Sequence, residues 1–257
     1  MKRVFAVVVV CIGGVMPGGC MCDCMKKTEK VNEYKITLGS HSAVTPVPRP
    51  DSWDWWTKRH QAIVDRVKQG NVDMIFIGDS ITYGWEVAGK DVWQQYYAKC
   101  NAVNMGYNSD RTQEVLWRLD NGEIAGISPK LAVVLIGVNN SAGEDNTVKE
   151  MSEGIIAVCQ KLRKDLPNTK ILLLAIFPAL EKPCPQRDKN AEASKLVSAI
   201  ADNKWIYYLD IGDKFVGKAG VISKDIMPDF GHPSAKGYQI EAEALEPMVA
   251  KLMGEKK

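Results

Sequence analysis

A serine in the segment G-D-S-I-T, residues 78–82, stands in surroundings that suit catalysis. The segment directly follows a short apolar run at residues 74–77, which predicts a turn from a buried strand into a helix. At such a turn the hydroxyl of Ser80 is exposed and a backbone N–H lies near the start of a helix, as a nucleophile requires. Taken alone, the same residues are more often a simple helix cap in a turn.

A serine nucleophile needs a base, and the chain contains three histidines. His41 lies in a proline-bearing segment, and His60 lies in an amphipathic stretch where a packing or surface role is simpler. His232 follows Asp229 by three residues in one short loop. A carboxylate there can hold the imidazole in the tautomer whose other nitrogen accepts the serine proton. The residues therefore predict a triad with Ser80, although an isolated D-x-x-H loop is more often simply solvated.

Acyl transfer through a serine also needs donors for the oxyanion of the tetrahedral intermediate, and each missing donor costs about 3 kcal/mol. Asn139 follows the apolar run at residues 131–136, so its side-chain amide can reach the same crevice. A backbone N–H from the loop at residues 104–110 is a second candidate. Each feature is common turn chemistry when taken singly. Their succession after apolar runs is what predicts a site.

Short apolar runs separate these segments and predict the strands of one parallel sheet. The runs lie at residues 74–77, 102–104, 131–136, 171–176 and 206–209. A segment long enough for a crossover helix separates each pair, which is the pattern of an α/β protein. Thr147 and Glu150 form a T-x-x-E capping box, and a last helix is expected over about residues 234–252, with a kink at Pro247. Because ligands bind beyond the carboxyl ends of parallel strands, the candidate segments should meet in one crevice.

The composition is that of a globular protein with one sizeable core. The chain has 257 residues, of which 46% are hydrophobic and 25% are charged. Its 33 Lys and Arg against 31 Asp and Glu leave a net charge of +2, without a basic block. This balance predicts no nucleic-acid partner, and it favours a small or uncharged substrate.

The N-terminus differs from the rest of the chain. Lys2 and Arg3 precede an apolar run at residues 4–16, which is shorter than the roughly 20 residues of a membrane-spanning helix. Residues 1–24 therefore resemble a bacterial signal peptide. Cys20 after two glycines resembles a lipoprotein box, although Pro17 stands where such boxes usually carry leucine. Two alternatives stay open: a membrane tether through lipidated Cys20, or release into the periplasm.

Residues 25–50 carry few large apolar side chains and end in alternating prolines, a composition typical of a linker. One domain is then expected over residues 51–257. Trp53, Trp55 and Trp56 open its first amphipathic stretch. Such a cluster can stack on sugar rings, but it more often packs a helix onto the core.

These blocks together resemble the SGNH (GDSL-like) hydrolases, which are named for a catalytic Ser, an oxyanion-hole Gly and Asn, and a catalytic His. The resemblance covers essentially residues 51–257. Within that family the chain resembles the branch of the catalytic subunits of platelet-activating-factor acetylhydrolase and their bacterial relatives. The segments that carry this resemblance are residues 104–140, with V-L-W-R-L at 115–119 and N-G-E at 121–123, then E-K-P at 181–183, Arg187 and Asn190.

The resemblance implies a flavodoxin-like three-layer α/β/α domain with a five-stranded parallel sheet, and catalysis without a metal or other cofactor. It also implies Ser80 as nucleophile, with Asp229 and His232 completing the triad. Asn139 and the backbone N–H of Ser80 are implied as oxyanion donors.

The glycine block of the resemblance is less regular. Aligning Asp110 with the family's aspartate puts Ser109 at the glycine position. A backbone N–H serves from either residue type, although a left-handed conformation costs a non-glycine residue about 1 to 2 kcal/mol. Ser109 is therefore the expected donor, and Gly106 is its competitor.

The expected activity is a serine esterase acting on short-chain, mainly acetyl, esters. Because an exported bacterial enzyme meets acetylated glycans, O-acetyl groups on carbohydrates are the expected substrate. A lysophospholipase or thioesterase with a longer acyl channel is an alternative, and a catalytically silent glycan-binding module is a weaker one. Lys182 and Arg187 either line the substrate cleft or are solvated loop charges. The branch resemblance leaves a homodimer open.

Overall fold

The structure is a computed structural model that describes residues 36–50, 54–142 and 146–254. The expected signal peptide, Cys20, residues 25–35 of the expected linker and Trp53 lie outside the described residues. Within the described part, no helix is at once long and apolar enough to cross a membrane.

Five parallel strands form one sheet in the order β2-β1-β3-β4-β5. The strands are β1 (Met74–Gly78), β2 (Ala102–Gly106), β3 (Leu131–Leu135), β4 (Lys170–Leu174) and β5 (Ile206–Leu209). Each strand coincides with one of the apolar runs, because strands covered by helices on both faces need apolar side chains on both. The order is that of flavodoxin-like folds, so the predicted fold class is confirmed.

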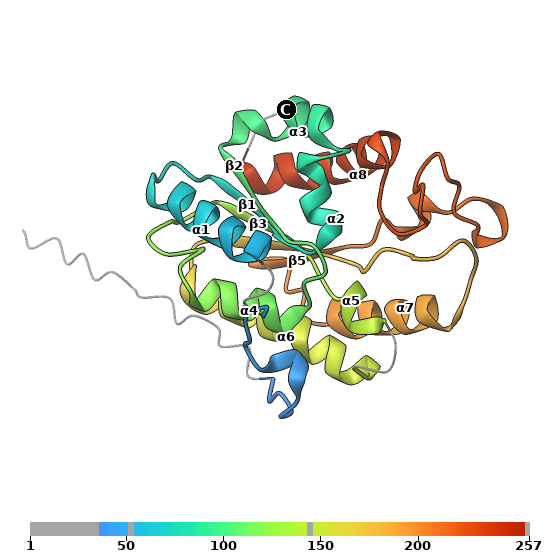
Figure 1. Cartoon of the computed structure of the whole chain (residues 1–257), viewed down its shortest axis with the longest axis horizontal. Helices are drawn as coiled ribbons and strands as arrows, with labels where there is room; N and C mark the ends of the chain where they lie inside the picture. Colours follow the sequence, from blue (N-terminus) through green and yellow to red (C-terminus); the bar gives the residue numbers. More distant parts are fainter. Residues whose placement is uncertain (1–35, 51–53, 143–145, 255–257) are drawn as a thin grey trace, which may run out of the picture. The chain divides into compact units, whose positions relative to one another are not determined.

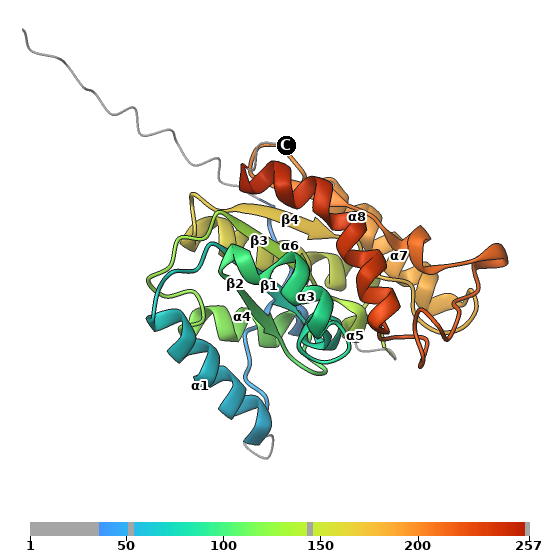
Figure 2. The ribbon, with the colours of Figure 1, turned by 90° about the horizontal axis from the view of Figure 1, so that it is seen from above.

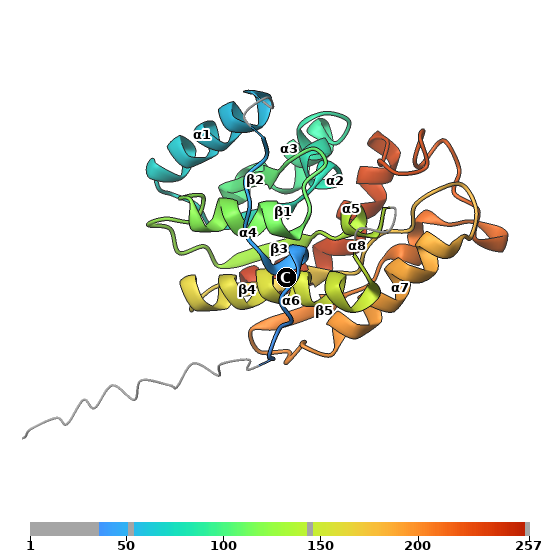
Figure 3. The same cartoon turned by 60° about the horizontal axis from the view of Figure 1, so that its bottom comes forward.

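Helices cover both faces of the sheet. The α-helices are α1 (Asp54–Lys68), α2 (Ser80–Tyr83), α3 (Lys90–Tyr96), α4 (Thr112–Asp120), α5 (Val138–Ser141), α6 (Val148–Asp165), α7 (Pro185–Ser198) and α8 (Ala235–Met253). The short 3-10 helices are η1 (Ser42–Val44), η2 (Gly84–Glu86), η3 (Ala98–Cys100), η4 (Gly212–Phe215) and η5 (Lys218–Gly220). Figure 1 shows α4, α6 and α7 on one side of the sheet and α3 and α8 on the other. Figure 2 brings the α3 and α8 side to the front, and Figure 3 brings α4, α6 and α7 forward.

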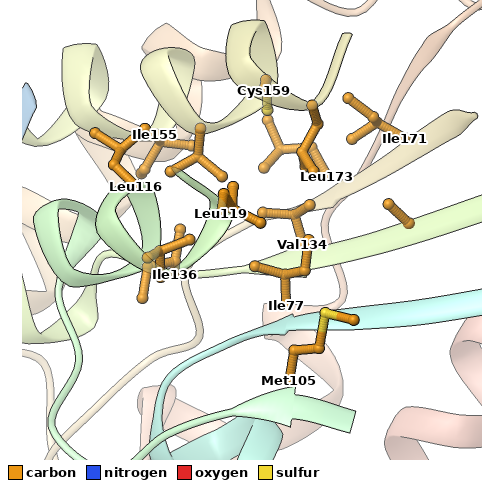
Figure 4. Close-up of a cluster of buried hydrophobic side chains, with 14 of the residues drawn as sticks. Ile77, Met105, Leu116, Leu119, Val134, Ile136, Ile155, Cys159, Ile171 and Leu173 are labelled. Carbon is orange, nitrogen blue, oxygen red and sulfur yellow. The ribbon is translucent and has the colours of Figure 1, made fainter. Parts of the chain in front are cut away.

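Two apolar cores lie on the two faces because side chains alternate along each strand. Ile77 of β1 points into the first core, which α1, α4, α6 and α7 complete. Figure 4 shows Ile77 there beside Val134 and Leu119. Phe76, one residue earlier, points into the second core, where α3 and α8 contribute side chains such as Leu245. Fully burying one such side chain stabilises the fold by about 1.5 to 3 kcal/mol.

The two longest helices begin at the predicted residues. The hydroxyl of Thr147 accepts the N–H of Glu150 at 3.3 Å, and the Glu150 carboxylate accepts the N–H of Thr147 at 2.8 Å. The capping box that starts α6 is thereby confirmed. The hydroxyl of Ser234 accepts the N–H of Gly237 at 3.2 Å and starts α8, which continues through Pro247.

The segment before α1 differs from the expected linker. Residues 36–50, blue in Figure 1, lie against α4 and α6. Ala43 is fully buried in η1, and Leu38 and Val44 pack against the first core. Composition does not reveal this docking, because a few small apolar side chains suffice when the surface that receives them is already formed.

Candidate active site

Ser80 is the first residue of α2, directly beyond the carboxyl end of β1. Asp79 caps this helix by accepting the N–H of Ile81 on its Oδ1 at 3.0 Å. The capping interpretation therefore applies to Asp79, and Ser80 stays half-buried at the surface. A Cβ on Gly106 would lie 2.1 Å from the backbone nitrogen of Tyr83, so only glycine lets β2 approach α2 this closely.

The structure brings Ser80, His232 and Asp229 together across 152 residues of sequence. The Oγ of Ser80 lies 2.8 Å from Nε2 of His232. Nδ1 of the same ring lies 2.7 Å from Oδ2 of Asp229. This is the hydrogen-bonded order nucleophile, base and carboxylate that serine acyl transfer uses.

Local hydrogen bonds hold the loop that carries the base. Oδ1 of Asp229 accepts the backbone N–H groups of Gly231 at 3.0 Å and His232 at 2.8 Å. One carboxylate oxygen thus shapes the loop, and the other orients the imidazole. The hydroxyl of Tyr238 on α8 donates to the carbonyl of Ile81 at 2.6 Å, so the helix after this loop is tied to the helix of Ser80.

The carboxylates near Ser80 differ in environment. Partial burial raises the pKa of Asp229, but hydrogen bonds from His232 and Gly231 outweigh that effect, and the pKa lies below its ordinary value. Asp229 therefore carries a negative charge beside the imidazole at neutral pH. Complete burial raises the pKa of Asp79 to about 7, against the lowering by the Ile81 N–H and by His232.

A cleft of about 540 Å³ opens over these groups. Its lining consists of Ser80, Ile81, Asn108, Ser109, Val138, Asn139, Ala142, Gln186, Gly231 and His232. Ser109 has φ +63°, the left-handed conformation considered from sequence. Gly106 does not line the cleft, and its N–H donates to Oδ1 of Asn104 at 2.8 Å. The structure thus brings Ser109 and Asn139 to Ser80, but not Gly106.

Buried hydrogen bonds to Asp110 restrain the loop that carries Ser109. Nε of Arg118 lies 2.8 Å from Oδ2 of Asp110, and the indole N–H of Trp56 donates to Oδ1 at 2.8 Å. Burial raises the pKa of Asp110 to about 6, although Arg118 and Trp56 lower it. Nδ2 of Asn139 donates to the Asp110 carbonyl at 2.9 Å, so the two candidate oxyanion loops are joined.

His60 and Trp56 have the packing role expected for them from the sequence. His60 packs on Trp56, with ring centroids 5.8 Å apart, and its Nδ1 lies 3.2 Å from Glu123. Trp56 is buried, whereas Trp55 is 40% exposed and contacts Tyr83 edge-on.

Arg187 makes structural contacts that neither interpretation anticipated. Its guanidinium donates to the backbone carbonyls of Ala179, Leu180 and Gly220, so it joins two loops and does not line the cleft. Lys182 is exposed and is likewise absent from the cleft lining.

Sequence reasoning missed Asn108 and Gln186, which contribute amide groups to the cleft. Asn108 lies inside the loop already singled out, so its position was a usable signal, whereas Gln186 at the start of α7 had none. Among the described residues, no group of three or more His, Cys, Asp and Glu side chains is arranged to hold a metal ion.

Comparisons with known proteins bear on the family and the fold of the chain. Residues 76–240 match the model of the GDSL-like Lipase/Acylhydrolase family. The chain is 34% identical over 203 residues to platelet-activating factor acetylhydrolase IB subunit alpha2 of Rattus norvegicus, covering 79% of this chain and 86% of that protein. Two solved structures are similar in fold. A GDSL-like lipase from Bacteroides thetaiotaomicron aligns with a TM-score of 0.58 at 19% identity, covering 77% of this chain and 97% of that one. An acetylxylan esterase from Geobacillus stearothermophilus aligns with a TM-score of 0.55 at 19% identity, covering 73% of this chain and 96% of that one.

Proposed function

This chain belongs to the GDSL-like lipase/acylhydrolase family, and on that premise we propose that it is a serine esterase that removes short acyl groups, above all acetyl, from carbohydrate hydroxyls. Family membership makes it a hydrolytic esterase. The observation that carries the mechanism is the chain of hydrogen bonds at 2.8 and 2.7 Å through Ser80, His232 and Asp229. A catalytically silent binding module does not fit this geometry.

In the first step, Oγ of Ser80 attacks the ester carbonyl while Nε2 of His232 takes the hydroxyl proton. The tetrahedral intermediate then collapses. The bond to the alcohol oxygen breaks, and the imidazolium returns its proton to the leaving alcohol. Asp229 keeps the ring in the required tautomer and stabilises the imidazolium between these transfers.

Three donors face the developing oxyanion in this proposal: the backbone N–H groups of Ser80 and Ser109, and the side-chain amide of Asn139. The amide of Asn139 has two N–H bonds, and only one is needed for the Asp110 carbonyl. Their placement around the cleft before substrate arrives is what makes such donors effective, because no reorganisation is needed during the reaction.

In the second step, water attacks the acyl-enzyme while His232 accepts its proton. The bond between the acyl carbon and Oγ of Ser80 breaks, and the proton returns to Oγ. The carboxylic acid leaves, which restores the free enzyme. About half of the surface of the His232 and Asp229 side chains is exposed, so water reaches the base directly.

Two observations support an acetylated carbohydrate as substrate. The cleft combines amide side chains from Asn108 and Gln186, which can bind sugar hydroxyls, with a small apolar surface from Val138 and Ala142, which suits a methyl group. The names of the relatives also indicate acetyl transfer to water, since one is an acetylhydrolase subunit and one is an acetylxylan esterase.

Replacing Ser80 by alanine tests the nucleophile. S80A should lose hydrolysis of p-nitrophenyl acetate and labelling by a fluorophosphonate, with an unchanged melting temperature. The matched control is S198A at the end of α7, which should keep both. Ordinary esterase activity in folded S80A would contradict the mechanism.

A substrate panel tests the specificity. Acetate release from acetylated xylo-oligosaccharides should exceed hydrolysis of p-nitrophenyl octanoate and of lysophospholipids. A clear preference for the octanoyl ester or the lysophospholipid would replace the carbohydrate proposal by a lipid acyl hydrolase.

We also propose that the chain is exported, because residues 1–24 have the pattern of a signal peptide. Fractionation of cells that express the full chain should place it outside the cytoplasm. Incorporation of labelled palmitate that is lost in C20S would identify a lipidated tether, and its absence would identify release into the periplasm.

A further inference from the structure

We propose that residues 41–49, here called the N-terminal strap, position the donors of the oxyanion hole; this inference rests on the serine-esterase proposal above. The strap runs across α4 and α6 (Figure 3). None of its residues lines the cleft. Its hydrogen bonds nevertheless reach both loops that carry the candidate donors.

The strap contacts the Ser109 loop directly. The guanidinium of Arg49 donates to the backbone carbonyl of Ser109, and it also lies 3.7 Å from Oδ1 of Asp110 and 3.7 Å from Oε2 of Glu114. Ser109 has φ +63°, which is costly for a serine unless neighbours hold it. Because the backbone angles of Ser109 also set the direction of its N–H, a restrained carbonyl restrains the donor.

A ring of hydrogen bonds joins the strap to the Asn139 loop. The hydroxyl of Ser42 accepts from Asn146 at 2.9 Å, and Oδ1 of Asn146 accepts from Asn140 at 2.9 Å. Oδ1 of Asn140 accepts the N–H of Thr112 at 3.1 Å. The ring closes where the Thr112 hydroxyl donates to the Ala43 carbonyl at 2.7 Å.

The ring starts and ends on the strap and spans both oxyanion loops. Thr112, Asn140 and Asn146 are all at most 2% exposed. Buried polar networks whose members are all paired are rigid, because breaking one bond leaves a desolvated group unpaired. Asn140 is the immediate neighbour of Asn139, and Thr112 starts α4 directly after the Ser109 loop. The network therefore restrains the two donors relative to each other.

The surface that receives the strap is shaped for close contact. A Cβ on Gly154, in the middle of α6, would lie 2.5 Å from the Thr112 hydroxyl and 2.8 Å from the Ala43 carbonyl. Glycine destabilises a helix interior relative to alanine, so its presence at this position has a packing reason. The start of the strap is fixed to the same helix, because Nε2 of His41 lies 2.7 Å from Oε2 of Glu153.

Substitution of Arg49 by methionine in the full-length chain tests the proposal. A donor displaced by about 1 Å can cost on the order of 100-fold in rate, so we expect R49M to lower kcat for p-nitrophenyl acetate at least about tenfold. KM should change less than about twofold, because the oxyanion exists only in the transition state. The rate of fluorophosphonate labelling should fall in parallel, and R49K, which keeps a donor, should recover part of kcat.

The matched control is R66M. Arg66 also donates to backbone carbonyls, those of Gly70 at 2.8 Å and Asn71 at 3.2 Å, but at the amino-terminal side of β1, away from the cleft. R66M should lower the melting temperature comparably and leave kcat unchanged. A second test variant, S42A, opens the ring of hydrogen bonds without touching Arg49, and it should also lower kcat.

The outcomes separate the two proposals. Unchanged kcat in both folded R49M and S42A, or an equal loss in R66M, would overturn the role of the strap. If R49M does not fold, S42A decides. Failure of the fluorophosphonate to label Ser80 in the wild-type chain would instead overturn the serine-esterase mechanism itself.

Discussion

Replacing Glu241 by glutamine should remove a pH dependence of folding stability that arises from the ionisation of this buried carboxyl group. Glu241 lies on α8 and is 2% exposed. Burial raises the pKa of its carboxyl group to about 8; a hydrogen bond from Trp85 lowers it, and repulsion from Asp79 raises it further. Tyr238 on the same helix packs against Trp85 with the rings tilted and their centroids 4.5 Å apart, so Glu241 lies in the packing between α8 and η2.

The sign follows from the two states of the chain. In the folded state Glu241 stays protonated up to about pH 8, whereas in the unfolded chain it ionises near its ordinary pKa of 4.5. The contribution of Glu241 to the free energy of unfolding is therefore fully present below about pH 4.5, and it declines as the pH rises to about 8. Between pH 5 and pH 8, proton linkage gives a loss of roughly 3 kcal/mol from this group.

Urea unfolding of wild-type chain and E241Q at pH 5, 6, 7 and 8, followed by tryptophan fluorescence, measures this loss. Glutamine does not titrate, so the stability of E241Q relative to the wild type should rise by roughly 3 kcal/mol across this range. Costs that do not depend on pH, such as pairing the new amide, cancel in that difference. E243Q, two residues away on the exposed face of α8, is the control and should show a constant difference. A constant difference for E241Q as well would refute the reasoning.

Three further substitutions test the candidate site. D229N should lower kcat by about 100-fold to 10,000-fold, because its amide cannot hold the same tautomer of His232. Its stability should change little, because the amide oxygen can still accept the loop N–H groups. Activity above a tenth of wild type would argue against this role of Asp229. N139A should lower kcat on an acetyl ester by about 100-fold to 1,000-fold with a small change in KM, and a pure KM effect would argue against an oxyanion donor. S109G should keep kcat within about threefold in the same assay, because the backbone N–H remains. It should change the free energy of unfolding by less than about 1 kcal/mol, because relief of left-handed strain offsets the greater conformational freedom of glycine in the unfolded chain. Loss of activity in S109G would show that the serine side chain is needed.

The alternation of strands and helices along the chain was predictable from local pattern alone. Apolar runs that must be buried on two faces, separated by segments of helical length, leave few alternatives to a parallel sheet. The same topology explains why Ser80 and Asn139 lie at one rim, because each directly follows a strand and parallel strands end on the same side. Asp229 and His232 are close in sequence, so their pairing was equally visible.

Contacts between distant segments decided the rest. The preference for Ser109 over Gly106 depends on Asn104, whose side chain takes the glycine N–H, and on the packing of β2 against α2. Arg187 resembles a surface charge in sequence, yet three carbonyls from two loops converge on it in the structure.

The sequence by itself determined the alternation of strands and helices, the capped helices and the loops that carry the candidate triad, because each depends on periodicity or on neighbours within a few residues. Only the tertiary structure decided whether Ser109 or Gly106 lines the cleft, how far burial shifts the pKa of Asp79 and Glu241, and where the strap lies. These properties depend on which groups surround a residue in space, and spacing along the chain does not contain that information.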